Sequence, residues 1–193
     1  MGLSDFLVIL RENEIIRRYV TINSFDGALT IFGIVLANFV VGIQNPMLVI
    51  LPSIGAIIAL GVSGVWSAYV AEAAEIKKSL NELERHLLRE LDGTRRHRNA
   101  QRTTFLVALV NGLSPFTAAC SIMMPFVLAY FNVLGMTLAY YTAFLIVALL
   151  LFLLGIFLGK IAEENVIKNG FKMLLAGVVI SAIFYILSLF GAL

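Results

Sequence analysis

The chain of 193 residues contains a single cysteine, Cys120, and only two histidines, His86 and His97. One thiol cannot close an intrachain disulfide or build a cysteine metal cluster. The histidines lie in a charged segment with no evident nucleophile–base pair. A glycine-rich nucleotide loop, a GxSxG elbow and an HExxH motif are also missing. The sequence therefore predicts no enzyme and no resident cofactor.

Charge is scarce as well. Charged residues make up 13% of the chain and hydrophobic residues 60%, and the mean hydropathy is +0.95. A soluble domain of this length could not bury so much apolar surface. Five apolar segments each approach the ~20 residues that a membrane-spanning helix needs, at 22–43, 48–71, 104–130, 135–159 and 170–191. The sequence therefore predicts an all-α integral membrane protein with five transmembrane helices.

Basic residues gather on one side of these spans. They precede span 1, they fill the connection between spans 2 and 3, and they occupy the connection between spans 4 and 5. The other connections and the tail carry no charge. Because basic loops stay in the cytoplasm, the N-terminus is expected to be cytoplasmic and the C-terminus outside. The N-terminal residues do not fit a signal peptide, because their charges follow the apolar stretch and no small-residue cleavage site appears.

The segments that flank the spans have their own patterns. Residues 1–20 read as an amphipathic interfacial helix, and 21–193 as one five-span membrane domain. Within 72–103, span 2 is expected to continue into the cytoplasm as a helix ending near Asp92-Gly93, followed by a basic linker. The basic run 95–102 favours anionic lipid headgroups as its partner, and not nucleic acid. The extension carries an apolar seam that suits packing on another helix or on a second copy of the chain, formed by Ile76, Leu80, Leu83 and Leu87.

The chain also contains a faint internal repeat. Residues 25–30 align with 110–115, and 71–76 align with 162–167. Spans 1–2 and 3–4 therefore resemble two copies of one hairpin that cross the membrane in the same sense. Parallel repeats of this kind recur in transporters.

Oxygen-bearing side chains recur at one depth of the predicted bundle. Asp26, Asn111 and two glutamates are expected near the cytoplasmic edge of the hydrocarbon, with further glutamates outward of them. The candidate cation ligands are Asp26, Glu72, Glu75, Glu82, Asn111 and Glu163. The glutamates have a second interpretation as solvated interface residues that pair with nearby lysines.

Two positions in the spans leave alternatives open. Asp26 either binds a cation or proton, or caps a helix broken at Gly27. Pro115, after Asn111-Gly112, makes span 3 the best candidate for a discontinuous helix. Met123 and Met124 fit apolar packing better than soft-metal ligation.

Two stretches resemble a known family. TINSFDGALTIFGIVLAN and VALVNGLSPFTAACSIMMPF resemble the first and third spans of the vacuolar iron transporter family, which includes the yeast vacuolar iron/manganese carrier. The resemblance implies a homodimer that exchanges Fe²⁺ or Mn²⁺ for protons, with Asp26 at the family's functional aspartate. The family's span 2 methionine and glutamate are Gly64 and Ala68 here. Of its glutamate-rich cytoplasmic domain only the first helix is present.

Together with this resemblance, the polar residues in the spans predict a divalent-cation/proton antiporter in a prokaryotic cell membrane. The resemblance implies that it moves its substrate out of the cytosol. Metal ions and protons would be its substrates, and a second copy its partner. The competing interpretation is a non-transporting membrane scaffold, dimerised through the seam over 76–91, in which Asp26 is only a helix cap.

Overall fold

The structure, a computed structural model, describes residues 14–87 and 95–190, with side chains described for 17–86 and 104–190. Within these ranges it contains no strand and five helices: α2 (Glu14–Val41), α3 (Pro46–Leu87), α4 (Arg95–Tyr130), α5 (Met136–Ile161) and α6 (Val166–Leu189). Each has a segment long and apolar enough to cross a membrane. The expected all-α, five-span, multi-pass membrane protein is confirmed at this level.

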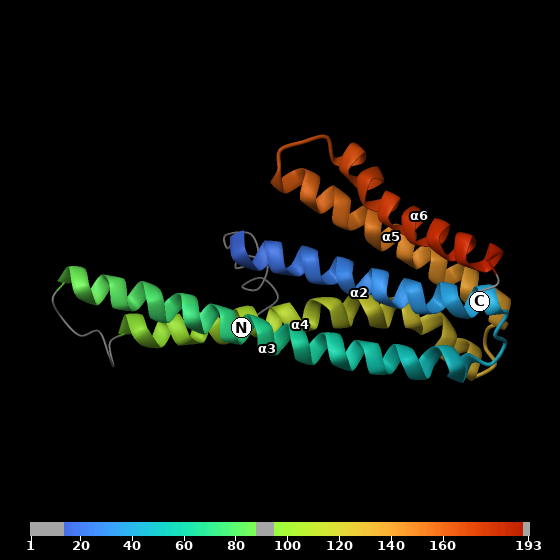
Figure 1. Cartoon of the computed structure of the whole chain (residues 1–193), viewed down its shortest axis with the longest axis horizontal. Coiled ribbons are helices and arrows are strands. Elements are labelled where there is room, and N and C mark those ends of the chain that lie inside the picture. The colour runs from blue at the N-terminus through green and yellow to red at the C-terminus, as the bar shows by residue number, and fades with distance from the viewer. Residues whose placement is uncertain (1–13, 88–94, 191–193) are drawn as a thin grey trace.

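The helices run alternately up and down (Figure 1), and the connections 42–45, 131–135 and 162–165 are short. One end, here called the basic end, gathers the starts of α2, α4 and α6 and the ends of α3 and α5. The opposite, uncharged end holds the connections 42–45 and 131–135. Helices α2, α3 and α4 form one group, and the α5–α6 hairpin packs across α2 (Figure 1).

Helix α3 projects beyond the other spans together with the start of α4 (Figure 1). Its 42 residues correspond to ~63 Å, about twice the thickness of a hydrocarbon core. The predicted continuation of span 2 as helix is therefore confirmed through Leu87. The predicted stop at Asp92-Gly93 lies outside the described residues.

The apolar seam of this extension is half-buried at Ile76, Leu80 and Leu83. The most extensive helix packing of α3 is with α4. This favours α4, and not a second copy, as the helix that covers the seam.

Two expected interruptions are absent from the described helices. Helix α2 runs through Asp26 and Gly27 without a break, so the interpretation of Asp26 as a helix cap is wrong: the helix is already formed about three turns earlier. Helix α4 likewise continues through Pro115, so the predicted discontinuity of span 3 is wrong. Packing of α2 and α3 against α4 supports the helix where this proline removes a backbone donor.

Residues 14–20 form the first turns of α2. They were expected to belong to a separate interfacial helix over 1–20. The other part of that expectation, residues 1–13, lies outside the described residues.

The core lies between α2, α3, α4 and α5. It is aliphatic and aromatic, and its fully buried side chains include Ile31, Val35, Val49, Ile122, Phe126, Tyr140 and Leu151. The α5 side chain Tyr140 donates its hydroxyl to the Ile43 carbonyl at 2.9 Å, at the uncharged end. Helix α6 is peripheral, because only Gly170 and Gly177 are buried along it.

Candidate functional site

Asn111 is the polar centre of the α2–α3–α4 group. Its side chain is 4% exposed, and its Nδ2 donates to the Gly64 carbonyl of α3 at 2.6 Å. Its Oδ1 accepts a hydrogen bond from Asn23 Nδ2 of α2. Asn111 therefore joins three helices inside the membrane-spanning region, where water offers no alternative partner.

The small residues of α3 make this contact reachable. A Cβ on Gly64 would lie 3.1 Å from both the Asn111 carbonyl oxygen and the Gly112 Cα. Gly64 therefore forms part of a close helix-packing surface between α3 and α4.

A second polar bridge lies nearer the basic end. The Tyr19 hydroxyl of α2 donates to Glu72 Oε1 of α3 at 3.1 Å, and the Tyr19 carbonyl accepts from Asn23 Nδ2 at 2.8 Å. Glu72 is half-buried. The two bridges follow one another along α2 and fix its position against α3 and α4.

Asp26 lies outside this network, on the exposed side of α2. Among the described residues, none donates a hydrogen bond to its carboxylate or forms an ion pair with it. Asp26 precedes Val41, the last residue of α2, by fifteen residues, or ~22 Å, and the hydrocarbon core is ~30 Å thick. The carboxylate therefore lies within the membrane-spanning part of α2, about one and a half turns from its basic edge.

The face of α2 around Asp26 is exposed along two turns of helix. Ile22 and Thr30, one turn away on each side, are also exposed, and a Cβ on Gly33 would meet nothing within 4 Å. This face of α2, defined by Ile22, Asp26, Thr30 and Gly33, is not covered by another described helix.

The remaining candidate ligands are exposed. Glu75 and Glu82 lie along the extension of α3, and Glu163 lies in the α5–α6 connection. Within the described part of the chain, no group of three or more His, Cys, Asp or Glu side chains is placed to hold a metal ion. One copy of the chain thus brings Asn111 and Glu72 to the interior of the group and leaves Asp26 facing outward.

Sequence reasoning missed Asn23 and Tyr19 as parts of the polar network. The available signal was their i, i+4 spacing, since Asn23 is an amide inside an apolar run and shares a helix face with Tyr19.

The backbone of Glu163 ends helix α5, a role that does not involve its carboxylate. It occupies the left-handed region (φ 54°), and the next residue, Glu164, donates its N–H to the Gly159 carbonyl at 3.0 Å, a helix ending that usually places glycine at this position. We expect Glu163→Gly to raise stability by about 0.5–1 kcal/mol, because the strain of a side chain in this region exceeds the entropy cost of glycine. Thermal unfolding in detergent measures the change. The matched control is Asn132→Gly (φ 59°), whose gain should be smaller because asparagine tolerates this region; equal gains would contradict the explanation.

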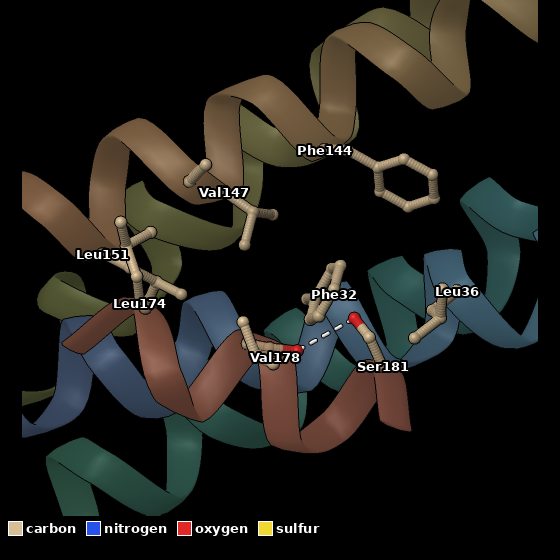
Figure 2. A pocket seen from close by; sticks show the side chains of 10 residues that line it. Phe32, Leu36, Phe144, Val147, Leu151, Leu174, Val178 and Ser181 are labelled. Atoms are coloured by element: carbon tan, nitrogen blue, oxygen red, sulfur yellow. Dashed lines mark hydrogen bonds between the residues drawn. The ribbon is translucent and has the colours of Figure 1, made fainter. Parts of the chain in front are cut away.

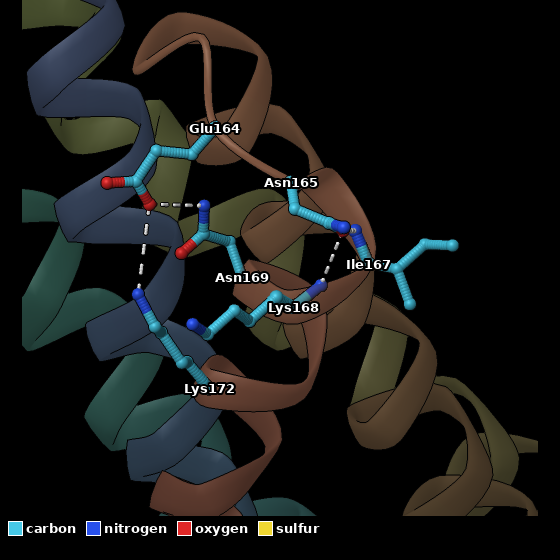
Figure 3. A network of polar contacts seen from close by, with 6 residues as sticks. All are labelled: Glu164, Asn165, Ile167, Lys168, Asn169 and Lys172. Carbon is cyan, nitrogen blue, oxygen red and sulfur yellow. Dashed lines mark hydrogen bonds and ion pairs between the residues drawn. The ribbon is translucent and has the colours of Figure 1, made fainter.

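The start of α6 carries a compact polar network (Figure 3). Asn165 Oδ1 accepts the N–H groups of Ile167 and Lys168, both at 3.1 Å, and caps the helix. Asn169 Nδ2 donates to Glu164 Oε2 at 3.0 Å, and Lys172 Nζ lies 3.8 Å from the same oxygen. The Asn169 hydrogen bond first, and the Lys172 charge second, hold the pKa of the Glu164 carboxyl below its usual value.

Because this pKa is lowered by folding, Glu164 contributes stability above its unfolded-state pKa and loses that contribution as the pH falls through its folded-state pKa. We therefore expect Glu164→Gln to be less stable than wild type at neutral pH, with the difference vanishing in acid. Melting curves across acidic to neutral pH test this, with Glu75→Gln as an exposed control. A difference that stays constant with pH would contradict it.

Five membrane-spanning helices, an interior amide network and an outward-facing intramembrane carboxylate define the chain as a multi-pass α-helical membrane protein. No family model matches the sequence, and no solved structure matches it. An uncharacterized protein of the archaeon Methanocaldococcus jannaschii is 28% identical over 173 residues, which cover 88% of this chain and 87% of that protein. The similarity extends over nearly the full length of both chains.

Proposed function

We propose that the protein is a homodimeric transporter that exchanges divalent cations of the Fe²⁺ or Mn²⁺ kind for protons across a prokaryotic cell membrane. The basic end faces the cytoplasm, in accordance with the distribution of lysine and arginine, and export is the working direction. The observation that carries the proposal is the position of Asp26, an exposed carboxylate within the span of α2.

A carboxylate at this depth is costly unless it meets a partner or water. Insertion of a charged residue at the centre of a membrane helix costs about 3 kcal/mol, and such residues usually face a bundle interior or an aqueous path. No described helix covers Asp26, so a second copy is the simplest way to enclose it. Thr30 and Gly33 on the same face are small enough to let two α2 helices approach closely.

Symmetry then supplies the ion site. In a two-fold dimer the face of α2 would meet its own copy, so two Asp26 carboxylates would lie opposite each other. Two carboxylates near one another favour either a bound divalent cation or a shared proton. Competition between these two states is the chemistry that a cation/proton exchanger needs.

The other predicted residues receive supporting roles in this proposal. Glu72, Glu75, Glu82 and Glu163 lie toward the basic end and would concentrate cations near the entrance. Asn111 acts as a positioning residue, because both ends of its amide are occupied by Asn23 and Gly64, and Asn23 precedes Asp26 by less than one turn.

Metal-dependent stability tests the proposal directly. A ligand that binds only the folded state raises the melting temperature, so Mn²⁺, Fe²⁺ or Co²⁺ should stabilise the detergent-purified protein. The effect should vanish in Asp26→Ala and persist in Glu164→Gln, which removes a carboxylate outside the spans. Identical metal responses of wild type and Asp26→Ala would overturn the assignment of Asp26.

A non-transporting dimeric scaffold is the second candidate. The lack of a three-member ligand group within the described residues favours it. In that case Asp26 would be satisfied by a partner protein, and none of the tested metals would change the melting temperature.

A further inference from the structure

An apolar cleft of about 460 Å³ lies between α2, α5 and α6 (Figure 2). Phe32 and Leu36 of α2, Phe144 and Val147 of α5, and Leu174 and Val178 of α6 line it. The polar side chain in the lining is Ser181, and its hydroxyl donates to the Gly177 carbonyl at 2.9 Å. The cleft therefore offers no free polar partner to an ion or a sugar, but it suits hydrocarbon.

The cleft lies where the α5–α6 hairpin separates from α2. Contacts between α2 and α5 include edge-on ring pairs, Phe39 with Tyr140 at 5.3 Å and Phe32 with Phe144 at 6.0 Å, all in the half of α2 nearer the uncharged end. From there the hairpin diverges from α2 toward the basic end (Figure 1). The space between the helices thus widens in the direction of the basic end.

Positive charge lies at that end of the hairpin. Lys160 lies in the last turn of α5. Lys168 and Lys172 belong to the first turns of α6, and Lys172 precedes Leu174 of the cleft lining by two residues. The Lys172 side chain is 55% exposed, and its ion pair with Glu164 is long at 3.8 Å. The ammonium groups therefore remain accessible to a phosphate at the membrane surface.

We propose that the cleft between α2, α5 and α6 is a binding site for an anionic phospholipid of the leaflet at the basic end, with one acyl chain in the cleft and the phosphate near Lys168 and Lys172. The charge at one end and the uninterrupted apolar lining beyond it match the two parts of such a lipid. From Lys172 to Val178 is six residues, or ~9 Å of helix, so along the axis of α6 the lysines lie less than two turns from the cleft lining. This site is independent of Asp26 and of the proposed transport.

Photocrosslinking tests the site. The full chain is reconstituted into nanodiscs with phosphatidylglycerol or phosphatidylcholine that carries a diazirine near the middle of one acyl chain, and the labelled peptides are mapped by mass spectrometry. Phosphatidylglycerol should label the segments 144–151 and 174–181 about tenfold more than phosphatidylcholine does, because two lysines favour the anionic headgroup. Lys168→Gln with Lys172→Gln should remove this preference, whereas Lys77→Gln with Lys78→Gln on the extension should leave it.

Filling the cleft provides the second arm. Ala148 lines the cleft and is exposed, so Ala148→Phe should suppress labelling of both segments, and Val178→Trp should do the same. Leu149→Phe, one residue away and outside the cleft lining, should not. Label spread evenly over all lipid-facing helices, or unchanged labelling in both cleft-filling variants, would overturn the proposal.

Discussion

Asp26→Ala is expected to reduce metal flux in proteoliposomes to the level of empty liposomes. The carboxylate is the one acid that the described structure places within the span and away from the bundle interior, so no neighbouring side chain can replace it. Alanine is small and has a high helix propensity, and position 26 lies in the interior of the continuous helix α2. Folding should therefore be preserved. The loss is measured as uptake of Mn²⁺ into vesicles. The uptake is driven by a pH gradient and is followed with a metal-sensitive dye inside the vesicles.

Two companion variants sharpen this result. Asp26→Glu keeps the charge and should retain partial flux, whereas Asp26→Asn keeps the shape, loses the charge and should behave like alanine. Glu164→Gln removes an acid outside the spans and should transport normally. If wild type and Asp26→Ala show equal flux, the proposed mechanism is wrong.

Gly27→Ala should produce a large loss of stability for the addition of a single methyl group. A Cβ on Gly27 would lie 2.6 Å from the Pro115 carbonyl oxygen and 2.7 Å from the Pro115 Cα. Both are backbone atoms of α4 and cannot move aside as a flexible side chain does, so α2 and α4 must separate. Overpacking of this kind costs about 1–3 kcal/mol, and denaturation in detergent by thermal or chemical means measures it.

The control is Gly55→Ala in α3, where an added Cβ would meet nothing within 4 Å. There the better helix propensity of alanine acts alone and should stabilise by about 0.5–1 kcal/mol. The two substitutions are chemically identical, and their expected effects have opposite signs. A stabilised Gly27→Ala variant would show that α2 and α4 do not pack as described.

The spans and the long α3 helix were predictable from the sequence, because each depends on a local property. Twenty apolar residues define a membrane helix wherever they occur, and the apolar seam through Ile76, Leu80 and Leu83 belongs to one helix face. The identity of the helix that covers that seam is a tertiary fact, and the sequence left it open between α4 and a second copy.

The two interpretations that failed depended on how the helices pack against one another. Asp26 beside Gly27 has the local chemistry of a helix start, and Pro115 after Gly112 has that of a break, yet both lie inside continuous helices. Gly27 and Pro115 instead pack against each other across α2 and α4. A residue that interrupts an isolated helix can serve as a contact surface in a bundle, and sequence position alone does not separate the two cases.

The partners of the interior amide Asn111 could not be predicted from the sequence either. Asn111 was identified as a polar residue at the right depth, but its partners, Asn23 and the Gly64 carbonyl, lie 88 and 47 positions away in the chain. Helix rotation decides whether an amide meets an ion or another amide. That rotation follows from the packing of small residues such as Gly64, which the apolar pattern does not encode.

The length of α3 gives the protein a mechanical property. One continuous rod joins the lipid-embedded segment to the projecting tip, so a change of inclination within the bilayer is magnified where the rod leaves it. A rotation of about 10° would swing the end of a ~30 Å arm by about 5 Å. A spin label at Glu82, near that tip, would therefore move by several ångströms when α3 tilts. Its displacement would report rearrangements around Gly64 that are too small to measure at Gly64 itself.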